Sequence, residues 1–336
     1  MSGAELLHIL VPHSAWSPDA DDASTLACAH AQSGVHHGSP VMIVGNADAE
    51  RRAHLLGVRS WDRVCPAGHS TTLRSPSNEH GAAAIVRARG PRRLVAWGPQ
   101  ATQLARRLSA RFDLPMSEIS LAPSAEFPGF PARAPTPLGP REDLRAELGL
   151  EESDVSLAMA DDPPVAGNAT RLAFLAGLLG LADGSRRTIA LAPRNAGLED
   201  RARRFHAGAR PEAPMLLLDA PTAVLWPAMD LAIITAEPPL PAPTLAHVSM
   251  LLAAGVPVVG PRDAGLTLLM GAEASRVLCA PATGPQAIAS LLRRTSLTEL
   301  QQATASLAPR LERFRAAFFD TLPQPPAKAP RPVTTA

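Results

Sequence analysis

The sequence predicts an α/β protein of two Rossmann-like halves, with parallel sheets that face a cleft. The chain has 336 residues, which is long enough for two domains of ordinary size. Short apolar runs alternate with helical patterns along the chain, as they do in βαβ units. This alternation stops once, in a Pro-rich stretch, and then restarts.

The first half begins with an apolar run from Leu6 to Val11 that ends at Pro12, which is typical of a buried strand in a parallel sheet. Gly and Pro punctuate the segments that follow it. Further strands are expected at 40–45, 61–65 and 93–97, and helices at 21–32, 48–56, 80–89 and 98–112.

Between Leu121 and Pro140 the density of Pro excludes a helix or a central strand, so this stretch is interpreted as a linker. The tail is also rich in Pro and is expected to be disordered. The predicted units are a first domain at 1–121, the linker at 122–140, a second domain at 141–322 and the tail at 323–336.

The second half repeats the alternation of strands and helices. Val256, Val258 and Val259 are expected to be almost fully buried, because a strand covered on both faces is an unbroken apolar run. The helices after Leu297 are expected to pack partly against the first half. Strands are expected at 155–160, 188–192, 215–218, 231–235, 256–259 and 276–279, and helices at 141–148, 169–181, 198–207, 222–228, 244–254, 285–294 and 297–322.

Charge and cysteine content exclude several classes of function. The 32 Lys and Arg nearly balance the 31 Asp and Glu, so neither nucleic acid nor an anionic membrane is an expected partner. Cys28, Cys65 and Cys279 form no CxxC pair, which argues against a zinc site or a disulfide framework. No apolar run reaches the roughly 18 residues of a transmembrane helix, and residues 1–14 are interpreted as a first strand rather than a signal peptide. A cytoplasmic protein without metal or cofactor is expected.

Four segments, in order, resemble family 4-like GT-B glycosyltransferases (glycosyl transferases group 1). They are PRRLVAWGPQATQLARRLSARFDLP at 91–115, REDLRAELGLEESDVSLAMA at 141–160, AMDLAII at 228–234 and MLLAAGVPVVGPRDAGL at 250–266. The resemblance implies a retaining sugar transfer from a nucleotide-sugar, held mainly by the second domain, to an unidentified acceptor on the side of the first domain.

The sequence departs from this family where the donor would bind. The two Glu of the family fall on Ala242 and Met250, and its Arg and Lys fall near Asp161 and Asn168. The glycine-rich loop after the first strand is replaced by HSAWSPDADDAS. The activity could therefore be altered or lost. The alternatives to sugar transfer are a non-catalytic GT-B-fold binding protein and a different two-Rossmann protein, such as an epimerase-like or periplasmic-binding-like module.

Six residues are candidates for binding the donor nucleotide, each with a structural alternative. The turn from Gly260 to Gly265 could offer backbone N–H groups to a diphosphate, or be a plain turn between strand and helix. Arg171 and Arg194 are the nearest cations, although a surface position is an equal alternative for Arg194. The full set is Arg171, Arg194, Gly260, Arg262, Gly265 and Glu273, and a solvated acid at a helix end is the alternative for Glu273.

His13, after the first strand, is the candidate for catalysis as a general base, with chance placement as the alternative. Trp97 could stack on a sugar ring or pack in the core. His36 and His37 are interpreted as a surface pair at a helix end.

Overall fold

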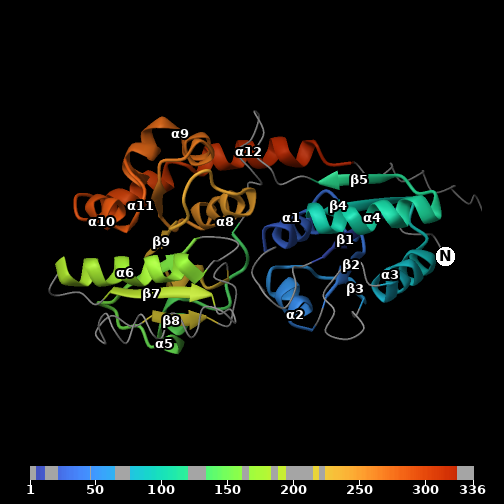
Figure 1. Ribbon diagram of the computed structural model, residues 1–336, viewed down its shortest axis with the longest axis horizontal. Helices are drawn as coiled ribbons and strands as arrows, with labels where there is room; N and C mark the ends of the chain where they lie inside the picture. The colour runs from blue at the N-terminus through green and yellow to red at the C-terminus, as the bar shows by residue number, and fades with distance from the viewer. Residues whose placement is uncertain are drawn as a thin grey trace, which may run out of the picture.

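The computed structural model of the chain places its strands in two separate parallel sheets, one in each of two lobes (Figure 1). The predicted fold class is therefore confirmed. The structure describes residues 5–11, 22–45, 47–64, 76–119, 134–160, 166–182, 188–193, 215–218 and 224–323. The predicted linker at 122–140 is described only from residue 134, where the chain has neither helix nor strand, and the domain limits stay a prediction.

The sheet of the N-terminal lobe has the strand order β3-β2-β1-β4-β5, and all its pairs are parallel. Its strands are β1 (Leu6–Leu10), β2 (Val41–Val44), β3 (Trp61–Val64), β4 (Arg93–Trp97) and β5 (Met116–Ile119), and its helices are α1 (Asp22–Ser33), α2 (Ala47–Leu55), α3 (Pro76–Arg89) and α4 (Gly98–Phe112). The sequence analysis did not predict β5, because its residues MSEI lack the apolar run of the buried strands and only Ile119 is buried.

The sheet of the C-terminal lobe has the order β11-β10-β9-β6-β7-β8. Its strands are β6 (Val155–Met159), β7 (Thr188–Pro193), β8 (Met215–Leu218), β9 (Leu231–Ile233), β10 (Val258–Pro261) and β11 (Cys279–Ala280). The helices around it are α5 (Arg141–Glu147), α6 (Ala166–Ala182), α8 (Ala242–Ala253), α9 (Ala264–Leu278), α10 (Pro285–Leu292), α11 (Leu297–Ala305) and α12 (Ala308–Asp320), with a 3-10 turn η2 (Trp226–Ala228).

The strand order reverses once in each sheet. In the N-terminal lobe β1 lies between β2 and β4, and in the C-terminal lobe β6 lies between β7 and β9. Ligands of open parallel sheets bind at the carboxyl ends of the strands where such a reversal opens a crevice. The fold therefore points to the segments that follow β6 and β9 as a place for a ligand.

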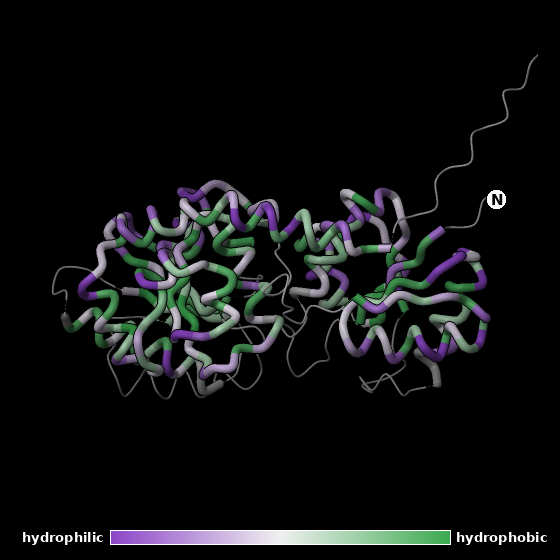
Figure 2. Tube along the Cα trace, turned by 90° about the horizontal axis from the view of Figure 1, so that it is seen from above, coloured by the Kyte–Doolittle hydropathy of each residue, from purple (hydrophilic) through white to green (hydrophobic). Residues whose placement is uncertain are grey.

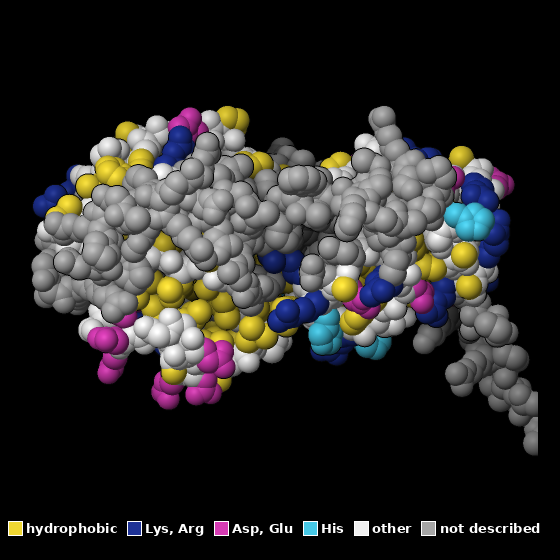
Figure 3. Space-filling model, turned by 60° about the horizontal axis from the view of Figure 1, so that its bottom comes forward, with side chains coloured by type: hydrophobic (Ala, Val, Ile, Leu, Met, Phe, Trp, Pro, Cys, Tyr) yellow, Lys and Arg dark blue, Asp and Glu magenta, His cyan; other side chains and the backbone are white. Residues whose placement is uncertain are grey.

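The core of both lobes is formed by the strands and the inner faces of the helices (Figure 2). The exposed fractions of Val256, Val258 and Val259 are 4%, 0% and 0%, which confirms their predicted burial. On the face shown in Figure 3, hydrophobic side chains gather on the C-terminal lobe, with acidic side chains at the margin. None of the described helices is long and apolar enough to cross a bilayer.

Three predicted elements of the second half need correction. The strand expected at 276–279 is wrong, because residues to Leu278 belong to α9 and only Cys279 and Ala280 form β11. The helix expected at 297–322 is divided into α11 and α12, since Pro309 in the first turn of α12 cannot continue a helix from α11. The helix expected at 222–228 is only the 3-10 turn η2 in the part described, and the helix expected at 198–207 lies outside the described residues.

The segment that follows α12 contacts the N-terminal lobe, on which the sequence analysis expected the helices after Leu297 to pack; the packing of the helices themselves stays a prediction. Figure 1 shows α12 extending from one lobe towards the other, and Pro323 follows its end. The Nε2 of His36 lies 2.7 Å from the carbonyl oxygen of Pro323. His36 is 1% exposed, so its prediction as a surface residue is wrong, whereas His37 is exposed.

Candidate functional site

Arg171 lies at the crevice where the strand order of the C-terminal sheet reverses. It is carried by α6, the helix that follows β6, and its Nη1 donates to the carbonyl oxygen of Thr235, just beyond β9, at 3.0 Å. Its Nη2 donates to Oε1 of Glu237 at 2.7 Å. The side chain of Arg171 is 38% exposed, so part of the guanidinium faces solvent at this crevice.

The N-terminus of α10 opens on the same small hollow as Arg171. Gly284 precedes this helix with φ 100°, a value that favours glycine, and no side chain caps the helix. The first N–H groups of a helix carry a partial positive charge, so α10 adds to the positive potential of the hollow. The residues around the hollow are Arg171, Leu175, Ile234, Thr235, Ala236, Pro261, Gly284, Pro285 and Ile288.

The turn from Gly260 to Gly265 connects β10 to α9. The carboxylate of Asp263, in this turn, occupies the N-terminus of α9. Oδ1 of Asp263 accepts from the backbone N–H groups of Gly265 at 2.7 Å and Leu266 at 3.1 Å. Oδ2 of the same carboxylate accepts from the N–H of Leu240 at 3.1 Å. These donors are therefore committed to an internal acceptor in this structure.

The two glycines of the turn have a packing role. A Cβ on Gly260 would lie 2.9 Å from Ile234, and a Cβ on Gly265 would lie 2.6 Å from Cδ1 of Leu245. Neither glycine has a positive φ, so close approach rather than backbone conformation selects them. Whether either one contacts a donor stays a prediction.

The predicted donor residues do not converge on one place. Arg171 lines the hollow at the switch-point crevice, whereas Arg262 lines a different hollow beside α9 and α12. Glu273 is exposed in the second part of α9, beyond a kink at Gly271. Arg194 and the catalytic candidate His13 lie outside the described residues, so their roles stay predictions.

The structure accounts for two other positions from the sequence analysis, Trp97 and Met250. Trp97 is fully buried and its Nε1 donates to Nδ1 of His8 at 2.8 Å, which is the packing alternative rather than a stacking platform. Met250 is fully buried in α8; it stands where the family that the sequence resembles has Glu. The side chains of Asp161 and Asn168 are not among those described.

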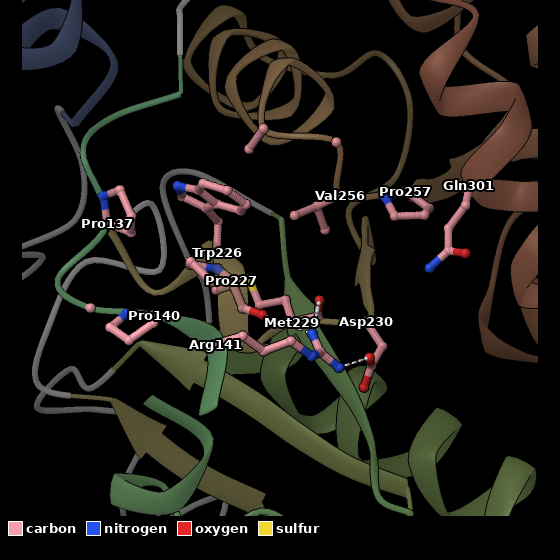
Figure 4. Close-up of a pocket in the computed structure, with 13 residues that line it drawn as sticks. Pro137, Pro140, Arg141, Trp226, Pro227, Met229, Asp230, Val256, Pro257 and Gln301 are labelled. Atoms are coloured by element: carbon pink, nitrogen blue, oxygen red, sulfur yellow. Dashed lines mark hydrogen bonds and ion pairs between the residues drawn. The ribbon is translucent and has the colours of Figure 1, made fainter. Parts of the chain in front are cut away.

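A larger hollow of about 730 Å³ lies at the opposite, amino edge of the C-terminal sheet (Figure 4). It is formed by the start of α5, which includes Arg141, and by the segments that precede α5, β9 and β10, which include Trp226. Arg141 donates to Oδ1 of Asp230 at 2.5 Å and to the carbonyl oxygen of Pro227 at 2.7 Å. These contacts connect the first residue of α5 to the segment just before β9. Parallel sheets bind ligands at the carboxyl ends of their strands, and this hollow lies at the amino ends.

Asp230 is the centre of a polar network at this edge. Its Oδ2 accepts from the backbone N–H of Ser156 at 2.9 Å and from Nη1 of Arg145 at 3.2 Å. Burial alone would raise the pKa of Asp230, but the Ser156 N–H and the guanidinium groups of Arg141 and Arg145 lower it. The network is structural, because it aligns the amino ends of β6 and β9.

Sequence reasoning identified Arg171 and missed its partner. That partner is Glu237, and a contact across 66 residues leaves no pattern in a single sequence. Among the described residues no group of three or more His, Cys, Asp or Glu is placed to hold a metal ion. The crevice therefore offers a guanidinium, a carboxylate and a helix N-terminus.

Neither a protein-family model nor a curated protein matches this chain. Solved structures do match over nearly the whole chain. HepE of Anabaena in complex with UDP and glucose has a TM-score of 0.62 at 13% identity, covering 95% of this chain and 100% of that one. A glycosyltransferase of Rickettsia africae has a TM-score of 0.55 at 9% identity, covering 95% and 99%.

A third similar structure is the UDP-GlcNAc 2-epimerase of Neisseria meningitidis bound to UDP-GlcNAc. Its TM-score is 0.55 at 8% identity, and the match covers 92% of this chain and 99% of that one. At such identities the likeness concerns the fold. The GT-B-like arrangement expected from the sequence is confirmed at that level, and membership of family 4 stays a prediction.

Proposed function

We propose that this chain binds a nucleotide-sugar at the switch-point crevice of the C-terminal sheet and transfers the sugar to an acceptor. The position of Arg171 carries the proposal, because its guanidinium lies partly exposed where an open parallel sheet binds ligands. The N-terminus of α10 adds positive potential at the same hollow. Structures with the same fold that contain UDP or UDP-sugars support this class of ligand.

In this proposal Arg171 binds the diphosphate. Guanidinium groups form strong, paired hydrogen bonds to phosphate oxygens, and they neutralise charge that develops on a leaving nucleoside diphosphate. The contact with Thr235 holds the guanidinium in place, while Glu237, whose side chain is 68% exposed, can turn away to admit the ligand. Family 4 remains the proposed family within the GT-B glycosyltransferases.

Non-catalytic nucleotide binding is the second candidate, and Met250 favours it. A buried Met in place of the ribose-binding Glu removes a charged hydrogen bond, which is worth about 1.5–3 kcal/mol. Affinity for the donor should then be lower than is usual for related enzymes.

Titration calorimetry with UDP on the wild type, Arg171→Gln and Arg293→Gln tests the proposal. Arg293 is an exposed arginine at the other end of α10 and serves as the matched control. Arg171→Gln should weaken binding about tenfold to hundredfold, and Arg293→Gln should leave it unchanged. The absence of UDP or GDP binding at millimolar concentration would refute the proposal.

Turnover separates the two candidates. UDP release from UDP-sugars in the presence of candidate acceptors would establish transfer, whereas tight binding without product would favour the non-catalytic protein. Conversion of UDP-GlcNAc to its 2-epimer, followed by chromatography, would show an epimerase instead.

A further inference from the structure

The hollow beside α9 and the start of α12 contains two arginines that the proposed donor site does not use. It is a wide, open hollow on the surface, with a volume of about 670 Å³. Arg262, at the end of β10, and Arg310, in the first turn of α12, both line it. Thr267 and Leu268, both on α9, also line the hollow.

Arg310 is fixed in place by contacts on several sides. Helix α9 is kinked at Gly271, where φ is 78°, and the carbonyl groups before the kink accept from Arg310. Its Nε donates to Leu269 at 3.0 Å and its Nη2 donates to Leu268 at 2.6 Å. Its guanidinium carbon also lies 5.0 Å from the ring centre of Phe314. A fixed guanidinium loses little conformational freedom when it binds an acceptor.

Glycine is favoured at Gly271 by its positive φ of 78°, and a Cβ there would make only ordinary contact, at 3.6 Å, with Cζ and Nη1 of Arg310. Nη1 of Arg310 has no acceptor among the described residues, and its N–H groups remain for a ligand.

The hollow keeps a net positive charge, although part of it is offset. Asp263 is the acid among the lining residues and balances one of the two guanidinium groups; it is 8% exposed and both its oxygens accept from backbone N–H groups. Arg262 is exposed, and within the described part of the chain its side chain meets no acceptor. Its backbone N–H is held by the carbonyl of Ala280 at 3.2 Å, which fixes the position of the residue at the mouth.

We propose that this hollow binds the phosphate group of a phosphate monoester, between Arg262 and Arg310. Two guanidinium groups from separate elements can bind different oxygens of one phosphate, and the Thr267 hydroxyl can donate to a third. Leu268, which is 37% exposed, provides an apolar contact for the carbon skeleton of the ester. The site is separate from the Arg171 hollow and does not depend on the proposed function.

Glycerol 3-phosphate is a suitable probe, with glycerol and succinate as the neutral and carboxylate controls at constant ionic strength. Phosphorus NMR and titration calorimetry should show binding of the phosphate ester by the wild type. Arg262→Gln should weaken it tenfold or more, while Arg276→Gln, an exposed arginine on α9 outside the hollow, should not. Succinate that binds as tightly as the ester would overturn the assignment to phosphate.

Two further variants keep the test independent of the donor site. Arg171→Gln should leave binding of glycerol 3-phosphate unchanged, and Arg262→Gln should leave binding of UDP unchanged. Loss of UDP binding in Arg262→Gln would place the diphosphate in this hollow and overturn the separate site. Equal binding of glycerol 3-phosphate by the wild type and Arg262→Gln, or no binding at all at millimolar concentration, would also overturn it.

Discussion

The indole Nε1 of Trp97 donates a hydrogen bond to Nδ1 of His8 at 2.8 Å, inside the core of the N-terminal lobe. His8 must therefore keep Nδ1 unprotonated and carry its proton on Nε2. Burial, and next the nearby His36 ring, lower the pKa of His8 to about 3. The ring centres of His8 and His36 are 4.9 Å apart, and burial also lowers the pKa of His36.

This arrangement predicts that the protein loses stability in mild acid. An unfolded His has a pKa of about 6.5, so between pH 6.5 and about 3 the unfolded state binds more protons at His8 than the folded state does. Above pH 6.5, His8 should cause no further change in the free energy of unfolding. At pH 5 the loss from His8 should be roughly 2 kcal/mol, with His36 adding to it in the same direction.

Denaturant titrations at pH 5 and pH 7.5 measure this dependence. His8→Gln is the informative variant, because Gln can accept from Trp97 and does not titrate in this range. The difference in unfolding free energy between the two pH values should shrink in His8→Gln. An unchanged difference would show that other groups cause the acid sensitivity.

The polar network at the amino edge of the C-terminal sheet should be costly to break. Asp230→Asn removes the charge that pairs with Arg145, whose side chain is 8% exposed, and should destabilise the protein by about 3 kcal/mol. Arg141→Gln should cost below about 1 kcal/mol, because the side chain of Arg141 is 47% exposed.

Thermal and denaturant unfolding of both variants measures the two costs, and equal losses would contradict the assigned difference in burial. The lowered pKa of Asp230 also makes the free energy of unfolding depend on pH. The stabilisation from Asp230 is fully present above the ordinary pKa of an aspartate and is lost as the pH falls through the lowered pKa.

Gly265→Ala tests close packing at the β10–α9 turn. Alanine in place of glycine in a helix usually stabilises by about 0.5–1 kcal/mol, whereas overpacking costs about 1–3 kcal/mol. Overpacking should dominate here, since the new Cβ would lie 2.6 Å from Cδ1 of the buried Leu245. Gly177→Ala in α6, where nothing lies within 4 Å of the new Cβ, should stabilise instead.

A double-mutant cycle with Leu245→Val assigns the cause, because the shorter side chain lacks the conflicting methyl group. The combined variant should be more stable than the sum of the two single changes predicts. Strict additivity would mean that the cost of Gly265→Ala has another origin.

Much of the fold could be predicted because buried parallel strands are short apolar runs in the sequence. Segments such as Val41–Val44 and Val258–Val259 carry that signal without ambiguity. β5 has a mixed polar sequence at a sheet edge, and the residues of α9 before Cys279 are as apolar as a strand. In both places local composition was insufficient because tertiary packing selects the structure.

The site was less predictable than the fold. Arg171 could be identified from its place after the strand β6, since topology decides which edge of the sheet binds ligands. The contact of Trp97 with His8 spans 89 residues, and that of Arg310 with Leu268 spans 42. Such pairs depend on how distant elements meet, which a single sequence does not encode in any local pattern.

His36 should hold the C-terminal end of α12 against the N-terminal lobe. With Nε2–H donating to the carbonyl of Pro323 at 2.7 Å, the ring links the turn after α1 to the segment that follows α12. His36→Ala removes this bond and leaves the half-buried carbonyl of Pro323 without its donor, at a cost of about 1 kcal/mol. Amide hydrogen exchange in residues 308–320 should therefore become faster, while exchange in α6 should not change. His37→Ala, at the exposed neighbouring position, is the matched control and should leave both helices unaffected. If α12 exchanges at the same rate in His36→Ala as in the wild type, this bond does not hold the helix, and the packing of α12 on α8 is sufficient by itself.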